Sequence, residues 1–385
     1  MAKVRMGMVG GGEGAFIGAV HRMAAGIDGE IDLVCGASSS DIDRARRSGR
    51  SLHLPPERVY ADYAEMMTAE AALPIDERMQ FVAVVTPNHL HFPVADAALA
   101  AGFHVLSDKP ATLNLAEALT LRERIESTGL LYGLTHTYTG YPLVKEARAR
   151  IAAGELGGLR RIVVEYPQGW LADRQEDADN KQAAWRLDAA QAGISSCMGD
   201  IGVHAANLAE YVSGQKIAAL CADLVAAVPG RTMDDDGAML LRFDGGANGL
   251  LFASQICVGE ENGLRIRVYG EKGGLEWAQQ EPNSLWLKWP DRPQQCLRTG
   301  GDYLGELARA NTRTPMGHPE GYLEAFANLY MAFAGQVRAR AAGETPDGRS
   351  LDCPGIREAV RGMTFIELAV AASASEQKWH PFPEH

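Results

Sequence analysis

Residues 4–15, VRMGMVGGGEGA, decide the fold at the start of the chain. The apolar run predicts a strand, the glycines after it predict a tight turn, and helical periodicity follows. Gly10, Gly12 and Ala15 fit the pattern G-x-G-x-x-[GA], which binds a dinucleotide where it joins a strand to a helix. The first glycine allows the turn, the second lets the backbone approach a pyrophosphate, and the third small residue lets the helix pack closely. The amides that open the helix then face the anion, so the stretch predicts a dinucleotide site, with a plain connecting turn as the alternative.

Up to Thr135 the chain continues as an alternation of short apolar runs and helical stretches. This alternation is typical of a parallel sheet covered by helices on both faces. We therefore expect an α/β dinucleotide-binding domain over residues 1–135. Its expected strands are Val4–Val9, Ile31–Ala37, Phe81–Val85, His104–Ser107 and Leu130–Leu134, and its main helices are Phe16–Ala25, Pro93–Ala101 and Leu115–Ser127.

Beyond Thr135 the pattern changes. A helix is expected at Pro142–Ala153, and strands follow one another between residues 218 and 289. Turn sequences such as Asp244-Gly245-Gly246 join these strands and favour antiparallel hairpins. Residues 136–385, including helices expected at Tyr322–Arg340 and Pro354–Ala374, are therefore assigned to a second domain of the α+β class.

The composition is that of an ordinary globular protein of 385 residues with a formal net charge of −12. A net acidic chain is a poor partner for nucleic acid or for anionic membrane surfaces, and no apolar run is long enough to span a membrane. The six cysteines lie at least 24 residues apart, which excludes C-x-x-C redox and zinc motifs. The first ten residues lack the apolar segment of a signal peptide. We expect a cytoplasmic protein with no metal and no nucleic-acid or membrane partner.

The end of the second predicted strand bears on which dinucleotide binds. In this position an acid normally binds the hydroxyls of the adenosine ribose, whereas an arginine favours the 2′-phosphate of NADP. Here Ala37-Ser38-Ser39-Ser40 is followed by Asp41, and the first arginine is Arg44. The serines suit either cofactor, but Asp41 and Asp43 would repel a phosphate, so NAD is favoured and NADP stays open.

Two further segments follow strands of the first domain. Thr86-Pro87-Asn88-His89 follows the third strand, and Asp108-Lys109-Pro110 follows the fourth. Ligands of open α/β sheets bind outside the carboxyl ends of the strands, so both segments should border the cofactor. A lysine in this position is well placed to hold a substrate oxygen.

Asp200 and His204 form a second chemical cluster. Their i, i+4 spacing puts them on one face of the helix expected from Ile201. The structural alternative makes Asp200 the N-cap of this helix and His204 a buried histidine. A zinc pair would need a third ligand that the sequence does not offer.

Several motifs, and their order along the chain, resemble those of the Gfo/Idh/MocA oxidoreductases. They are the glycine turn, Thr86-Pro87-Asn88 with His91, Asp108-Lys109-Pro110, Trp185-Arg186, and Gly199-Asp200-Ile201-Gly202-Val203-His204. The resemblance covers nearly the whole chain. It implies a Rossmann domain followed by a domain with a large, open, mostly antiparallel sheet that forms homodimers or homotetramers.

Three positions differ from the family pattern. Asp108 stands where the family usually has Glu, and Asn207 stands where an Asp often follows the histidine. Gly18-Ala19-Val20-His21 matches the family's Gly-x-x-His, but three residues later than the spacing from Gly10 requires. The turn is therefore enlarged, and the residues that touch the pyrophosphate lie within Gly12–Ile17.

The resemblance implies a dehydrogenase that oxidises a secondary hydroxyl of a cyclitol or pyranose, such as scyllo-inositol or L-glucose, by hydride transfer to the nicotinamide. Lys109 would stabilise the alkoxide, and either His204 or Asp200 would be the base. The alternatives are a glycosidase that retains NAD and a dinucleotide-binding sensor without catalysis.

Two sets of site residues follow. Those expected to bind the cofactor are Gly10, Gly12, Glu13, Gly14, Ala15, Phe16, Ile17, Ser38, Ser39, Thr86, Pro87, Asn88, His91, Asp108, Lys109 and His136. Those expected to bind the small-molecule substrate are Lys109, His136, Tyr138, Trp170, Trp185, Arg186, Asp200, His204 and His318.

Overall fold

The computed structural model describes residues 3–177 and 181–385, and the chain divides into two compact units. The first unit comprises the chain up to Thr137 together with Tyr322–Val360. The second unit comprises Tyr138–Gly321 and Arg361–His385. Each unit is built on its own sheet, one parallel and one mostly antiparallel, so the expected fold class is confirmed.

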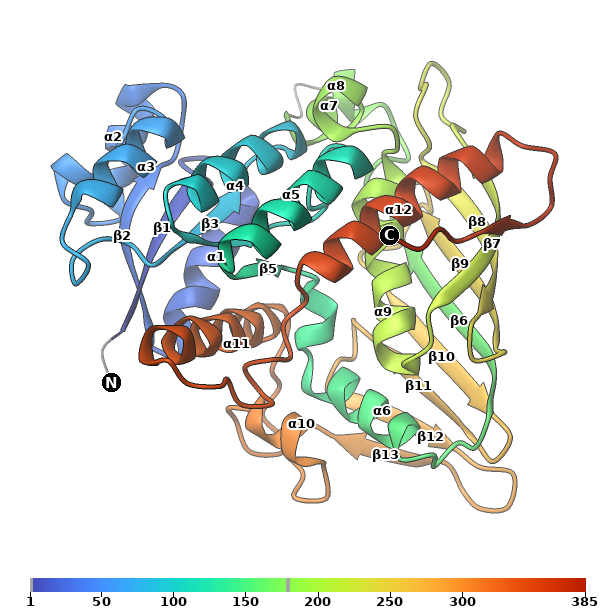
Figure 1. The fold of residues 1–385 in the computed structure, drawn as a ribbon. Helices are drawn as coiled ribbons and strands as arrows, with labels where there is room; N and C mark the ends of the chain where they lie inside the picture. Colours follow the sequence, from blue (N-terminus) through green and yellow to red (C-terminus); the bar gives the residue numbers. More distant parts are fainter. Residues whose placement is uncertain (1–2, 178–180) are drawn as a thin grey trace. The chain divides into compact units, whose positions relative to one another are not determined.

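The sheet of the first unit has five strands in the order β2-β1-β3-β4-β5, and all its pairs are parallel (Figure 1). The chain order changes direction between β1 and β3, which is the switch point where doubly wound sheets bind their ligands. The strands are β1 (Val4–Gly10), β2 (Ile31–Ala37), β3 (Phe81–Val85), β4 (His104–Ser107) and β5 (Tyr132–Leu134).

Helices cover both faces of this sheet. Val82 and Val84 of β3 pack with α3, α4 and α5, whereas Phe81 and Ala83 of the same strand pack with α1 and α11. Strand β3 is buried along its whole length, as a strand covered on both faces must be. The helices of this unit are α1 (Phe16–Ile27), α2 (Ile42–Ser51), α3 (Tyr63–Ala72), α4 (His91–Ala100), α5 (Leu115–Thr128) and α11 (Tyr322–Ala342), with short 3-10 turns η1 (Pro56–Arg58) and η2 (Asn88–Leu90).

The position of helix α11 corrects the domain boundary expected from the sequence. Both C-terminal helices were expected in the second domain, but the first of them, α11, belongs to the first unit. Its buried side chains Phe326, Tyr330 and Phe333 lie in the same apolar cluster as Val4 of β1 and Phe81 of β3. The physical reason is that α1 leaves part of this sheet face uncovered, and an apolar helix from the far end of the chain completes the cover.

The second unit contains a nine-stranded sheet in the order β13-β12-β11-β10-β6-β9-β8-β7-β14. Every pair is antiparallel except β6 and β9, which run parallel. Buried and exposed residues alternate along β8, so one sheet face is packed and the other is open. The strands are β6 (Leu159–Pro167), β7 (Ile217–Val225), β8 (Asp236–Phe243), β9 (Asn248–Ser254), β10 (Arg265–Gly270), β11 (Gly274–Ala278), β12 (Ser284–Lys288), β13 (Gln295–Arg298) and β14 (His380–Pro381).

The helices of the second unit are mostly short, and two of the longer ones, α6 and α9, pack against each other and against the sheet. A single π-helical turn, η5 (Met198–Gly202), leads directly into α9 (Val203–Ser213). The remaining elements are the 3-10 turns η3 (Thr137–Gly140) and η4 (Gln175–Asp177), and helices α6 (Pro142–Ala152), α7 (Lys181–Arg186), α8 (Ala189–Ala192) and α10 (Glu306–Ala310).

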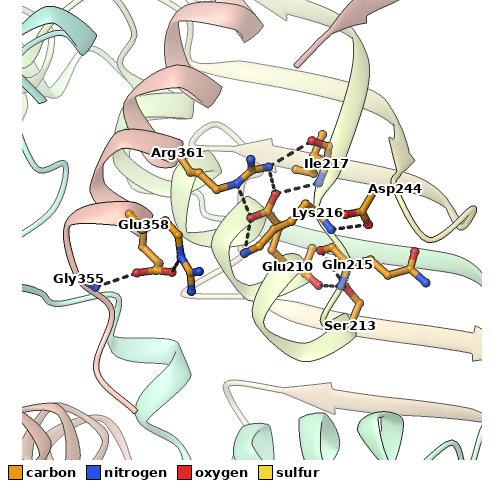
Figure 2. A network of polar contacts seen from close by, with 11 residues as sticks. Glu210, Ser213, Gln215, Lys216, Ile217, Asp244, Gly355, Glu358 and Arg361 are labelled. Carbon is orange, nitrogen blue, oxygen red and sulfur yellow. Dashed lines mark hydrogen bonds and ion pairs between the residues drawn. The ribbon is translucent and has the colours of Figure 1, made fainter. Parts of the chain in front are cut away.

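Helix α12 (Ile356–Ser373) contributes its first residues to the first unit and the rest, from Arg361, to the second. Figure 2 shows the ion pair that anchors the second part: Arg361 Nε donates to Glu210 Oε2 of α9 at 2.8 Å, and Nη2 donates to Oε1. Glu210 is buried and also accepts the Ile217 amide at 2.8 Å and Lys216 Nζ at 3.2 Å. Because its carboxylate is engaged on all sides, Glu210 fixes the end of α9 against α12.

Candidate active site

The glycine turn after β1 is held against helix α1 at Gly11. Gly10, Gly11 and Gly14 have φ values of +82°, +68° and +82°, which other residues rarely adopt. A Cβ on Gly18 would lie 2.3 Å from the Gly11 Cα, so the helix and the turn touch only because Gly18 has no side chain. The close-packing role that the sequence pattern gave to Ala15 is therefore taken by Gly18, because three extra residues enlarge the turn.

Arg22, one helical turn after Gly18, also holds Gly11. Its Nη1 donates to the Gly11 carbonyl at 2.5 Å and contacts Met8 Sδ at 3.6 Å. Burial lowers the pKa of Arg22, as expected for a guanidinium taken out of water. Its positive charge lies beside the Gly11 carbonyl, and a positive charge so near the turn favours the binding of an anion there. Sequence patterns gave no reason to single out Arg22.

The start of helix α1 fits a pyrophosphate. Ala15 is the N-cap and has no side-chain hydrogen bond to the helix, so no side chain caps the amides that follow. Phe16 and Ile17 form the first helical positions, and Phe16 is 69% exposed. A Cβ on Gly12 would lie 2.7 Å from the Ser38 carbonyl, so the turn closely approaches the end of β2. An open helix N-terminus at the β1 switch point is an anion site, and the residues present fit the diphosphate of a dinucleotide.

His91 lies between the two segments that follow β3 and β4. Its Nδ1 is 2.6 Å from the Pro110 carbonyl, and its Nε2 is 2.8 Å from the Thr86 carbonyl. The ring is 1% exposed, and burial lowers its pKa although the two carbonyls oppose this. His91 therefore ties together the segments that carry Thr86-Pro87-Asn88 and Lys109, and its effect on a bound cofactor passes through them.

The Asp108 carboxylate fixes the backbone of Lys109. It accepts the Lys109 amide at 2.9 Å and Thr135 Oγ1 at 2.8 Å, and His21 Nε2 lies 3.8 Å from its second oxygen. Burial alone would raise the pKa of Asp108, but nearby His21 and the charge of Lys109 hold it well below its usual range. Tyr330 of α11 in turn contacts His21 Nδ1 at 2.8 Å. Asp108, which is one methylene shorter than the usual Glu, thus holds the backbone amide of Lys109.

His136 is the last predicted site residue of the first unit. It is 1% exposed, and burial lowers its pKa to about 4, with the Lys109 charge acting in the same direction. His136 is therefore a neutral imidazole near neutral pH. A neutral ring can donate one hydrogen bond and accept one, which suits a residue that reads a hydroxyl group.

In the second unit, Asp200 lies at the centre of a polar cluster. Its Oδ2 accepts Gln255 Nε2 at 2.9 Å and pairs with Arg186 Nε at 3.3 Å. The Arg186 guanidinium lies 4.3 Å from the centre of the Trp185 ring and 5.9 Å from that of Trp170. The structure thus brings together Asp200, Arg186 and both predicted tryptophans. Asp200 is part of the π-helical turn and is not the N-cap of α9, so the structural alternative for it is wrong.

His204 is buried on the first turn of α9, with its ring 4.9 Å from that of Tyr138 in an edge-to-face arrangement. Burial raises the pKa of Tyr138, although its hydroxyl contacts Tyr166 and Asn262. Asn262 extends this chain of hydrogen bonds. Its Oδ1 accepts from the Tyr166 hydroxyl and from Gln168 Nε2, each at 2.7 Å. Gln168 Oε1 accepts Trp170 Nε1 at 3.0 Å, so the chain of contacts returns to the tryptophans.

Gln255 is a site residue that sequence reasoning missed. It is fully buried, its amide nitrogen is bound to Asp200, and its Oε1 has no hydrogen-bond partner among residues 3–177 and 181–385. A buried acceptor without a partner is costly, which favours a ligand that brings a donor such as a hydroxyl. The residue follows β9 and carries no motif, so only its position next to Asp200 identifies it.

Asp234 holds the π-helical turn that contains Asp200. Its carboxylate accepts the amides of Ser196 at 2.9 Å and Met198 at 2.8 Å, and Ser195 Oγ at 3.0 Å. Burial raises its pKa, and these donors act in the opposite direction. Asp234 is thus a positioning residue for Asp200. The sequence shows it in the run Asp234-Asp235-Asp236 but gives no partner for it.

His318 lies apart from this cluster in the contacts that the structure describes. It is exposed on a loop, where its Nδ1 is 3.3 Å from the Pro315 carbonyl. Buried Glu320 orders this loop by accepting the Thr314 amide at 2.6 Å. The loop therefore presents His318 outward, and a role in substrate binding remains a prediction.

No group of three or more His, Cys, Asp or Glu side chains in 3–177 and 181–385 is arranged to hold a metal ion. No helix in the same part of the chain is long and apolar enough to cross a membrane.

Two family descriptions match the chain. "Oxidoreductase family, NAD-binding Rossmann fold" matches residues 4–136, and "GFO/IDH/MocA C-terminal domain" matches residues 144–276. An uncharacterised oxidoreductase of Bacillus subtilis is 31% identical over 382 residues, which cover 98% of this chain and 97% of the relative.

Solved structures of an inositol dehydrogenase homologue from Azotobacter vinelandii are also similar. The complex with NAD+ has a TM-score of 0.94 and 36% identity over 99% of this chain and 98% of that one. The complex of the homologue with NADH and myo-inositol has a TM-score of 0.91 and 35% identity, with the same coverage. Both comparisons extend over both units of the chain.

Proposed function

Because the chain belongs to the Gfo/Idh/MocA family of NAD-binding oxidoreductases, we propose that it oxidises a secondary hydroxyl of a cyclitol or pyranose, of the scyllo-inositol or L-glucose kind. The observation that carries the proposal is the cluster around Asp200, where Arg186 and buried Gln255 bind the carboxylate and two tryptophan rings lie against the Arg186 guanidinium. Charged and amide groups suit hydroxyls, and indole rings suit the apolar face of a sugar ring. The Azotobacter homologue that binds myo-inositol supports the same substrate class.

We assign the proton chemistry to three residues. NAD, when bound, accepts the hydride. Lys109, fixed through its backbone by Asp108, is proposed to donate to the reacting oxygen and stabilise its negative charge. His204 is proposed as the base, with Asp200 orienting the substrate, and the reverse assignment of these two is equally consistent with the contacts. Arg186, His136, Tyr138 and His318 are proposed to bind the other hydroxyls.

The remaining proposed cofactor contacts are Gly10, Gly12, Glu13, Gly14 and Ala15 in the turn. Phe16 and Ile17 continue this set at the start of α1, Ser38 and Ser39 lie after β2, and Thr86, Pro87 and Asn88 lie after β3. These positions are the carboxyl ends of neighbouring parallel strands, where a dinucleotide binds in this fold.

We also propose that the open sheet face of the second unit forms a homodimer or homotetramer. Cross-strand register aligns Leu240, Leu250, Val163, Arg267, Glu276 and Trp286 in one row across β8, β9, β6, β10, β11 and β12. Leu240 and Trp286 are 43% and 39% exposed. Large apolar side chains aligned on an exposed sheet face favour burial against a second copy.

The proposed reaction is tested with purified protein, NAD+ or NADP+, and a panel of inositols and D- and L-pyranoses, by following the absorbance of the reduced nicotinamide. Reduction with one polyol supports the dehydrogenase. No reduction across the panel, in protein shown to bind the dinucleotide, contradicts it. Release of an aglycone from a glycoside without net NADH would instead identify a glycosidase.

A further inference from the structure

The end of β2 lacks an acid that could bind the adenosine ribose. After Ala37 come Ser38 and Ser39, and the first acid is Asp41. The structure shows that the Asp41 carboxylate caps helix α2 by accepting the amides of Asp43 at 2.9 Å and Arg44 at 3.1 Å. Both amides donate to the same oxygen, Oδ1, so the cap directs the Asp41 side chain to its own helix and leaves Oδ2 without a hydrogen bond to any described residue.

Glu13 brings a carboxylate to the same corner from the enlarged glycine turn. The residue before it, Gly12, approaches the Ser38 carbonyl so closely that a Cβ would lie 2.7 Å away. The Glu13 amide donates to Ser48 Oγ of α2 at 3.0 Å. Arg47 Nε of the same helix donates to Glu13 Oε2 at 3.2 Å. Two contacts from α2 therefore hold Glu13 beside the end of β2, where the ribose of a dinucleotide lies in this fold.

We infer that Glu13 takes the place of the missing acid and selects NAD over NADP. Glu13 Oε2 is bound to Arg47, whereas Oε1 has no hydrogen bond or ion pair with the described residues. Oε1 can therefore accept a hydrogen bond from a ribose hydroxyl. In NADP the 2′-hydroxyl is replaced by a phosphate that carries nearly two negative charges. One pair of like charges about 4 Å apart in water disfavours binding roughly fivefold and two such charges about 25-fold, and the Arg47 charge beside Glu13 offsets part of this repulsion.

The ion pair between Arg47 and Glu13 also keeps Arg47 from favouring NADP. Arg47 is the natural partner of a 2′-phosphate, but it is already bound to Glu13. If the carboxylate is removed, Arg47 becomes available to the phosphate. This inference deepens the proposed function, but it rests on dinucleotide binding by the first unit and not on the polyol substrate.

The test is equilibrium binding of NAD+ and NADP+ to the full chain, measured by calorimetry without any polyol. We expect the wild type to bind NAD+ about 5- to 25-fold more tightly than NADP+. In Glu13→Gln this ratio should fall by about tenfold or more, mainly through tighter binding of NADP+. In the double variant Glu13→Gln/Arg47→Met the gain in NADP+ affinity should disappear.

Asp43→Asn is the matched control. Asp43 was expected from the sequence to share in repelling the phosphate, but the structure shows it 78% exposed on α2, with a 3.8 Å pair to Arg46, so water screens its charge. Asp43→Asn should change the ratio by no more than about twofold. An unchanged ratio in Glu13→Gln, or an equal change in Asp43→Asn, would overturn the inference. Since no polyol is present, a chain that proves inactive on every polyol still gives a valid answer here.

Discussion

Replacement of Asp234 tests whether the second unit positions Asp200 through its backbone. Asp234 is buried and accepts two backbone amides, those of Ser196 and Met198, as well as the Ser195 hydroxyl. In Asp234→Ala both amides lose their acceptor inside the protein. In Asp234→Asn one acceptor remains, and the new NH2 group must face at least one of the two donors.

The contacts give the size of the effect. A buried donor without a partner costs about 1–3 kcal/mol, so Asp234→Ala should cost about 2–6 kcal/mol and Asp234→Asn about half of that. For a unit of this size, each kcal/mol lowers the Tm by about 2–4 °C, which gives a shift of roughly 10 °C for Asp234→Ala. The stability is lost locally, around the π-helical turn. Amide hydrogen exchange over residues 196–202 should therefore speed up by about 30-fold for each 2 kcal/mol lost from the free energy of local opening.

Asp235 provides the matched control. It is also buried and accepts two amides, those of Ala227 at 2.8 Å and Val228 at 3.0 Å, and it pairs with Arg231. Asp235→Asn should lower the Tm at least as much as Asp234→Asn. Exchange over residues 196–202 should nevertheless stay close to that of the wild type.

The two variants are compared by calorimetry, by hydrogen exchange with mass spectrometry, and by kcat on the polyol that the wild type accepts. We expect kcat to fall at least about tenfold more in Asp234→Asn than in Asp235→Asn. The reasoning would be refuted if exchange over residues 196–202 were unchanged in Asp234→Asn, or if both variants lost kcat equally.

Three other predictions follow from the first unit. Gly12→Val should abolish NAD+ binding, because its Cβ would meet the Ser38 carbonyl at 2.7 Å; equal affinity by calorimetry would contradict the placement of the turn. Lys109→Ala should lower kcat at least about 100-fold with NAD+ affinity retained, and unchanged turnover would remove Lys109 from the mechanism. Burial of Glu70 acts to raise its pKa, but its bonds to Arg58 and the Met79 amide outweigh this and lower it below the ordinary value of 4.5. Its ionised form therefore stabilises the fold above pH 4.5, and this contribution is lost as the pH falls through the lowered pKa. Glu70→Gln should accordingly lower the Tm at pH 7 and approach the wild type in acid, and a constant difference would contradict this.

Much of the first unit could be predicted from sequence because its signals are local. A strand, a glycine turn and a helix occupy consecutive residues, and the alternation of apolar runs with helical stretches repeats this pattern up to β5. Asp108-Lys109-Pro110 could be predicted at the carboxyl end of β4 for the same reason, since the end of a parallel strand is a fixed position in the fold. The family resemblance added the order of the motifs, and the comparisons support it.

The sequence by itself determined the two-sheet architecture and the dinucleotide-binding domain, and it singled out Lys109, Asp200 and His204 as candidate catalytic residues. Only the tertiary structure decided that α11 completes the first unit, that Gly18 and not Ala15 contacts the turn, and which partners Glu13 and Gln255 have. The side-chain partners of Glu13 and Gln255 lie 34 to 55 residues away along the chain, and Tyr330 of α11 lies 309 residues from its partner His21. Periodicity and spacing describe only neighbouring residues, whereas such contacts depend on which faces pack together, and that is fixed only when the whole core is formed.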